Sequence, residues 1–327
     1  MSARSLAIAV ALLALVAVPY VVNEVYYVNI ASQILLYAIF ALGLSVLVGY
    51  AGLVSLGHAG LFGVASYAVA FLLADGHGHL VAILAALVLS LVATAGFAAL
   101  SLRATGISFI MITLALGEIF WGLAYRWISV TNGDNGINVA TRPAPFGLSL
   151  DAARPFYDAT LVVFVLSVIA VATFVRSPFG AALAGTRDQP RRMAALGYHV
   201  WMIRFGAFMF SGLLTAVAGI LFVYYNKFIS PQSLALTASA EGLLMVISGG
   251  AGTLLGPIVG AALVVIVKNV VSASVVRWNF MLGAIFVAIV IFMPEGIVPG
   301  SVRLARSLWR GLNRPHKPAL PAVESKP

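Results

Sequence analysis

The chain has 327 residues, of which 62% are hydrophobic and only 9% are charged, and its mean hydropathy is +1.05. These values are far from those of soluble domains and indicate an integral membrane protein. The absence of cysteine excludes disulfides, thiolate metal sites and cysteine nucleophiles. The formal net charge of +9 lies at the ends of apolar segments. We therefore interpret it as a topology signal, not as a nucleic-acid surface.

The apolar segments predict an all-α polytopic fold with about eight to ten transmembrane helices, some of them interrupted by glycine. The first segment, residues 5–22 behind Arg4, favours a membrane span over a cleaved signal peptide. The other segments follow at about 29–48, 57–74, 80–101, 107–125, 159–176, 204–225, 238–250, 254–272 and 278–294.

Arginines orient these helices. The loop 177–203 and the tail 301–327 are rich in basic residues, which predicts that both are cytosolic and that the polar stretch 126–158 is an outer loop. The segment 238–272 must then cross twice, which gives ten spans. A single crossing would give nine spans and place the tail outside, and we favour ten. Residues 1–300 are thus predicted to be a transmembrane domain, and the end of the tail is predicted to be disordered.

Glycines interrupt two apolar stretches, one in each half of the chain, at 49–63 and 247–261. Paired broken segments are typical of a transport path between pseudo-repeated halves, although small residues also serve ordinary helix packing. The residues that this hypothesis assigns to the path or to helix breaks are Gly49, Gly52, Ser55, Gly57, His58, Glu118, Gly249, Gly250 and Gly252.

Few ionisable residues lie within the apolar segments. Glu118 is the most clearly embedded, at a cost of roughly 3 kcal/mol if charged. It is either a polar group near the path or an interhelical hydrogen-bond partner. Glu241 and Lys268 lie nearer span ends, where long side chains can reach the interface. His58 has no second ligand at helical spacing, so we predict a packing role and no metal site.

Several segments together resemble one family. The stretch GYAGLVSLGHAGLFG at 49–63 resembles the signature of the permease subunits of branched-chain amino acid ABC importers, of the LivM type. FIMITLALGEI, TNGDNGI, the block FISPQSLALTASAEGLLMVISGGAGTLLGPIVGA and FMPEGIV resemble later segments of that family in the same order. The resemblance covers most of residues 30–300 and implies a permease, with no catalytic residue of its own.

The cytosolic loop carries a further resemblance. GTRDQPRRMAALGYHV at 185–200 is similar to the segment that the family inserts into a cleft of its ATPase. Pro190 can open a short helix and Gly197 can end it, and the surrounding arginines suit a cleft with an acidic rim. The residues that the resemblance assigns to ATPase coupling are Arg187, Asp188, Arg191, Arg192, Ala194, Ala195, Leu196 and Gly197.

The resemblance implies a machine of several chains in the bacterial inner membrane. This chain would line a path with a second, homologous permease. Two cytosolic ATPases would use ATP and Mg²⁺, while this chain binds no cofactor, and an extracytoplasmic binding protein would deliver leucine, isoleucine or valine. The alternatives are a permease for amides, urea or a sugar, or an ion-coupled secondary transporter, which would normally have more carboxylates at mid-membrane. An intramembrane enzyme lacks the necessary nucleophile or metal cluster.

Overall fold

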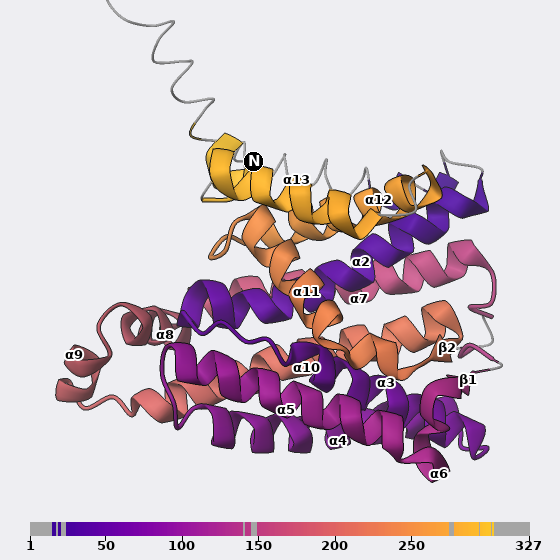
Figure 1. Cartoon of the computed structure of the whole chain (residues 1–327), viewed down its shortest axis with the longest axis horizontal. Helices are drawn as coiled ribbons and strands as arrows, with labels where there is room; N and C mark the ends of the chain where they lie inside the picture. The colour runs from indigo at the N-terminus through magenta and orange to yellow at the C-terminus, as the bar shows by residue number, and fades with distance from the viewer. Residues whose placement is uncertain are drawn as a thin grey trace, which may run out of the picture.

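A computed structural model of the chain describes residues 15–17, 19–20, 24–139, 141–144, 149–274, 278–293, 295–301 and 303. The predicted span 5–22 and the tail 301–327 lie mainly outside these residues. The described residues form a bundle in which most of the long helices run along the longest axis of the molecule (Figure 1). Five of these helices are long and apolar enough to cross a membrane. The predicted all-α polytopic fold is confirmed.

Two helices form the centre of the bundle. Helix α2, Val25–Ser45, continues into a π-helical segment, Val46–Ala51, so that a predominantly apolar helical run of 27 residues is uninterrupted. Helix α10, Val200–Asn226, packs along it. In the most apolar windows of these helices 78% and 61% of residues are buried, whereas the other three long helices have 22% to 28% buried. Those three cover the core: α4, His79–Ser101; α5, Ile107–Arg126; and α7, Ala153–Arg176.

Two shorter helices begin deep inside the bundle. Helix α3, His58–Ala74, follows the non-helical segment 52–57, and helix α11, Leu236–Gly249, follows a short 3₁₀ turn, Pro231–Leu234. Their N-termini meet, because the Ala59 amide donates to the Ser239 hydroxyl over 3.0 Å. At about 1.5 Å per residue, 17 and 14 residues are shorter than a ~30 Å hydrocarbon core. The glycine-rich stretch 49–63 is therefore a break between two helices.

The second glycine-rich stretch forms a tight helical hairpin. Helix α12, Gly256–Ser274, runs antiparallel to α11 after the turn 250–255, and helix α13, Trp278–Phe292, follows. The register is set by close backbone approach: Gly249 lies against Gly256, and Gly260 lies against Met245. Two antiparallel helices in this region are the arrangement that the predicted double crossing requires, and the total number of crossings stays a prediction.

The opposite end of the bundle, around β1, β2 and α6 in Figure 1, carries the predicted outer loop. Strand β1, Ile137–Asn138, pairs with β2, Phe228–Ile229, as an antiparallel two-residue ladder. Arg142 pins the loop by donating to four backbone carbonyls and stacking over a phenylalanine ring; its partners are Leu150, Asp151, Tyr224, Tyr225 and the ring of Phe156.

Two helices at this end differ from the sequence prediction, and an ion pair is added to them. Helix α7 begins at Ala153, six residues before the predicted span at 159, because Pro155 is tolerated in a first turn, whereas Arg154 and Asp158 keep residues 153–158 out of the apolar run. Lys227 Nζ lies 2.9 Å from Asp151 Oδ1. This hydrogen bond lowers the pKa of the Asp151 carboxyl below its usual value. Helix α6, Ile128–Thr131, is an additional single turn.

Candidate functional site

The ends of both glycine breaks meet at one arginine. A Cβ atom on Gly49 would lie 2.3 Å from the amide nitrogen of Gly252, so only glycine allows this approach. The Arg187 guanidinium donates to the Gly49 carbonyl, and its side chain also covers Gly52. The structure thus brings Arg187 together with three of the predicted path residues. Gly249 and Gly250 lie in the same turn as Gly252, and Gly250 packs on Pro299.

A two-helix unit projects from this end of the bundle. Helix α8, Pro178–Asp188, is capped by the Ser177 hydroxyl, which accepts from the Gly180 amide. Its inner face is anchored, since Leu183 is buried and Arg204 Nη2 donates to the Thr186 carbonyl over 2.8 Å. In Figure 1 the next helix, α9, protrudes beyond the bundle. Helix α8 is thus held against the bundle, and α9 forms the protruding tip of the unit.

Helix α9 and the residues next to it carry most of the residues predicted to contact the ATPase. Helix α9, Pro190–Ala195, begins at the predicted proline and has no buried residue. Gly197 follows in the left-handed conformation at φ +87°, and the Tyr198 amide donates back to the Met193 carbonyl over 3.1 Å. The helix thus ends where the sequence predicts. All of the predicted contact residues are exposed on this unit: Arg187, Asp188, Arg191, Arg192, Ala194, Ala195, Leu196 and Gly197.

The remaining residues of the first glycine break lie deeper. Ser55 and His58 are fully buried, and the His58 ring is hydrogen-bonded to Ser55 Oγ at 2.8 Å and to Ser211 Oγ at 3.0 Å. A Cβ on Gly57 would lie 2.1 Å from the Thr113 carbonyl oxygen, so α3 begins directly against α5. These contacts fit the predicted packing role of His58. The described residues contain no group of three or more potential metal ligands.

Glu118 is not brought to any of these groups. It is half-buried on α5, next to Gly117, whose backbone packs on Gly57. Within the described part of the chain, Glu118 forms no ion pair with a basic side chain. Its assignment to the path stays a prediction.

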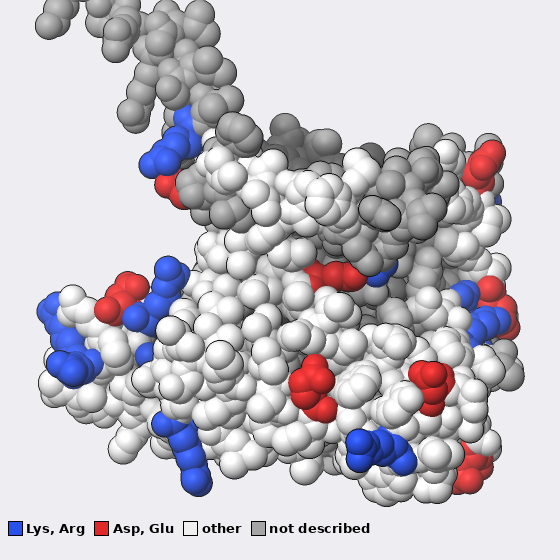
Figure 2. Space-filling model, viewed as in Figure 1, with Lys and Arg blue, Asp and Glu red and all other residues white. Residues whose placement is uncertain are grey.

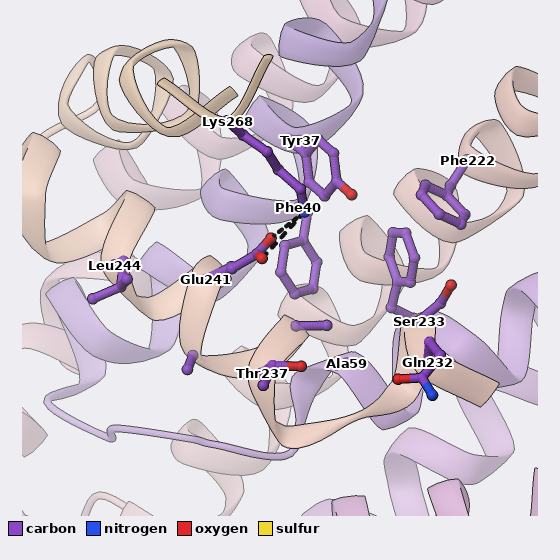
Figure 3. Close-up of a pocket in the computed structure, with 13 residues that line it drawn as sticks. Tyr37, Phe40, Ala59, Phe222, Gln232, Ser233, Thr237, Glu241, Leu244 and Lys268 are labelled. Carbon is purple, nitrogen blue, oxygen red and sulfur yellow. Dashed lines mark hydrogen bonds and ion pairs between the residues drawn. The ribbon is translucent and has the colours of Figure 1, made fainter. Parts of the chain in front are cut away.

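The structure contains a cavity that the sequence did not predict. A space of about 680 Å³ lies where the N-termini of α3 and α11 meet, bounded also by α2, α10 and α12. Lys268 Nζ lies 3.1 and 3.0 Å from the two Glu241 carboxylate oxygens at its edge (Figure 3). We expected these two side chains to reach the membrane interface; they instead pair with each other inside the bundle. The two residues are 27 positions apart in the sequence, and they come into contact because α11 and α12 run antiparallel.

Comparisons with known proteins agree with this architecture. The family described as "Branched-chain amino acid transport system / permease component" matches residues 26–290. The permease protein LivM of the high-affinity branched-chain amino acid transport system is 31% identical in Escherichia coli, over 89% of this chain and 74% of that protein. The Salmonella typhimurium LivM is 30% identical, over 87% and 72%.

A more distant relative belongs to a different import system. The autoinducer 2 import system permease protein LsrC of Salmonella paratyphi B is 28% identical, over 77% of this chain and 71% of that protein. No solved structure matches the chain. All three relatives are transport permeases and not enzymes. The chain is therefore a multi-pass membrane permease of the ABC type and belongs to the family of LivM-type branched-chain amino acid permeases.

Proposed function

We propose that this chain is the membrane-spanning permease of an ATP-driven importer of branched-chain amino acids in a bacterial inner membrane. The observation that carries the proposal is the projecting α8–α9 unit. A helix without any buried residue, placed at the basic end of a membrane bundle, contributes no side chain to the core of that bundle. Such a helix suits docking into a groove of a soluble partner.

The partner for this helix is an ATPase subunit. Exposed Leu196, at 66%, offers an apolar contact, and Arg191 and Arg192 would orient the helix on an acidic rim. In Figure 2 blue side chains gather over the end of the bundle where α8 and α9 lie. Force on α9 would reach α8, and through Arg187 it would reach the contact between Gly49 and Gly252. Nucleotide hydrolysis in the partner could thus move both glycine breaks together.

The rest of the importer follows from the same proposal. A second, homologous permease would cover the sparsely buried helices and complete the path. An extracytoplasmic binding protein would dock at the outer loop 126–158. The LivM relatives support leucine, isoleucine or valine as solutes.

A second candidate is an importer of a different small solute. The similarity to an autoinducer 2 import permease favours this alternative, and amides, urea and sugars belong to the same group of possible solutes. Uptake of a panel of radiolabelled solutes, in cells that express the complete set of neighbouring subunits, separates the two candidates. Uptake of isoleucine that is competed by leucine and valine supports the first.

The coupling role is tested by replacing the tip of α9. We expect Leu196→Glu with Gly197→Arg to abolish uptake while membrane insertion stays normal, because the apolar contact and the helix end are both lost. A matched control is Thr105→Arg, which adds a charge to the exposed turn between α4 and α5 on the predicted cytosolic side. Unchanged uptake by the tip variant, measured with [¹⁴C]isoleucine, would exclude α9 as the motor contact.

A further inference from the structure

The cavity beside Glu241 and Lys268 lies deep in the membrane part of the bundle. Tyr37, which lines it, stands 12 residues from the start of α2 at Val25 and 14 from the end of the helical run at Ala51. At about 1.5 Å per residue it is ~18 Å from the outer end of that helix. Red and blue atoms lie side by side in a hollow at the middle of the face seen in Figure 2. The cavity therefore opens at mid-bundle rather than at the water interface.

Opposite charges at this depth require a reason. The Glu241 and Lys268 side chains are 19% and 33% exposed, so neither is fully surrounded by protein. A buried pair is seldom a net source of stability, because desolvation offsets much of the attraction. Intramembrane charges that face a cavity are instead a common mark of a transport path.

The walls of the cavity are of two kinds. In Figure 3, Gln232 and Ser233 lie together on one side of the space, and Thr237 lies below Glu241. Another side is aromatic: the Phe62 ring lies 5.3 Å from the Phe40 ring and 5.1 Å from the Phe222 ring, measured between centroids. A ligand in this space would meet both charges, hydrogen-bonding groups and an apolar surface.

Helix α11 adds to the electrostatics of the cavity. Thr237 and Ala238 belong to its first turn and line the space. The Ala238 amide donates to the Ala235 carbonyl over 3.0 Å, so the partial positive charge of this helix end lies mainly on the amides of Leu236 and Thr237. Half-helices that end at mid-membrane direct such N-termini at anionic groups of transported solutes. A carboxylate would therefore be favoured between this turn and the Lys268 ammonium.

From this geometry we propose that the cavity is a binding site within the permease for a zwitterionic α-amino acid with an aliphatic side chain. The Glu241 carboxylate receives the ligand ammonium, and Lys268 with the first turn of α11 receives its carboxylate. The side chain packs on Phe40, Phe62 and Phe222. The inference deepens the proposed function, on which it rests, by placing the selection of this solute class inside the permease itself.

Other ligand classes fit less well. A zwitterion replaces one ion pair by two and leaves the net charge of the cavity unchanged, whereas a simple anion or cation would leave Glu241 or Lys268 without its partner. A neutral sugar or amide would have to compete with the ion pair without neutralising either charge. A volume of about 680 Å³ lies within the range of about 300–1,000 Å³ that is typical of small-molecule sites.

The absence of cysteine permits a direct binding experiment on the complete transporter in nanodiscs, without the binding protein. Ser233→Cys places a single thiol of this chain in the cavity wall, and Thr237→Cys provides a second position if the first variant misfolds. We expect millimolar isoleucine to slow alkylation of the thiol by about tenfold. 2-Methylbutylamine is isoleucine without its carboxylate and 3-methylpentanoate is isoleucine without its ammonium, so neither should protect the thiol.

Charge variants then separate ligand recognition from structure. In the Ser233→Cys background, Glu241→Gln or Lys268→Met should remove the protection by isoleucine. In the chain without the reporter cysteine, the same substitutions should lower uptake by about tenfold or more. Gln33→Leu is a matched control, because it removes a 2.9 Å hydrogen bond from Asn269 between α12 and α2 but does not line the cavity. Each single charge variant should also lose thermal stability, because it leaves one charge without its partner. The exchanged pair Glu241→Lys with Lys268→Glu should recover that stability without recovering uptake.

The outcomes separate this inference from the proposed function. Isoleucine that slows alkylation in the wild-type background and not in the charge variants supports the site. Wild-type isoleucine uptake combined with an unprotected thiol at both positions, or with full uptake by the charge variants, overturns it. Absence of isoleucine uptake by the wild-type transporter contradicts the proposed function, while the alkylation assay still reports whether the cavity binds an amino acid.

Discussion

At the scale of single residues, His58 joins three segments of the bundle. The Ser211 hydroxyl donates to the Gly43 carbonyl over 2.7 Å, so its oxygen must accept from His58 Nε2. The other ring nitrogen, Nδ1, then accepts from the Ser55 hydroxyl. We assign the neutral Nε2–H tautomer on this basis. The chain of bonds connects α2, the start of α3 and α10, and it leaves no ring nitrogen available for a metal.

The role of His58 can be tested by truncation. We expect His58→Ala to destabilise the protein by about 3 kcal/mol, because it opens a cavity and leaves two buried hydroxyl groups without their partner. His58→Gln should cost less, since its amide offers both a donor and an acceptor. The apparent melting temperature in detergent and the uptake per folded molecule check this. A stable His58→Ala protein with no uptake would instead assign His58 to the path.

At the scale of secondary-structure elements, the α11–α12 hairpin determines the geometry of the cavity. The two helices touch through backbone atoms, because a Cβ on Gly260 would lie only 1.8 Å from the Met245 carbonyl oxygen. This contact fixes the register that places Glu241 opposite Lys268. The glycines of the hairpin are therefore requirements of close packing, which explains their presence in helices where glycine is otherwise unfavourable.

We expect Gly260→Ala to destabilise the hairpin by about 2 to 3 kcal/mol, since backbone must move to admit the methyl group. The matched control is Gly96→Ala in α4, where an added Cβ meets no atom within 4 Å. The control should be neutral or more stable by up to about 1 kcal/mol, because alanine favours a helix. Apparent melting temperatures of the two variants give the comparison. Equal losses in both would refute the close-packing argument.

At the scale of the whole molecule, the two ends of the bundle differ in charge and structure. One end carries the arginine-rich α8–α9 unit, and the other carries the β1–β2 ladder and the loop held by Arg142. Arginine-rich loops remain in the cytosol. We therefore orient the molecule with α9 in the cytosol and the turn at Asn135 outside.

Single cysteines introduced into this cysteine-free chain test the orientation. A membrane-impermeant maleimide applied to spheroplasts should label Asn135→Cys and should not label Ala195→Cys. Inside-out vesicles should give the opposite pattern. Ala41→Cys, fully buried in α2, should stay unlabelled in both and serves as the control. Labelling of Ala195→Cys from outside would invert the topology.

Much of the fold was predictable because lipid solubility and helix boundaries are local properties. The apolar runs give the helices to within a few residues, and Pro190 and Gly197 delimit α9 as expected. Helix α7 starts six residues before its apolar run, because Arg154 and Asp158 are helical without being apolar. Of the predicted path residues, Gly49 meets Gly252 and Gly52 lies against Arg187, but nothing in their spacing indicated that Arg187 would join them.

The amino-acid sequence alone determined that this is a helical membrane permease, which family it belongs to and which loop is basic, since each depends on composition or on contiguous residues. Only the tertiary structure decided that Arg187 reaches Gly49, 138 residues away, and that the starts of α3 and α11 meet. It likewise decided that Glu241 and Lys268 face one cavity. The physical reason is that these contacts depend on the close packing of helices from distant parts of the chain, which local patterns do not encode.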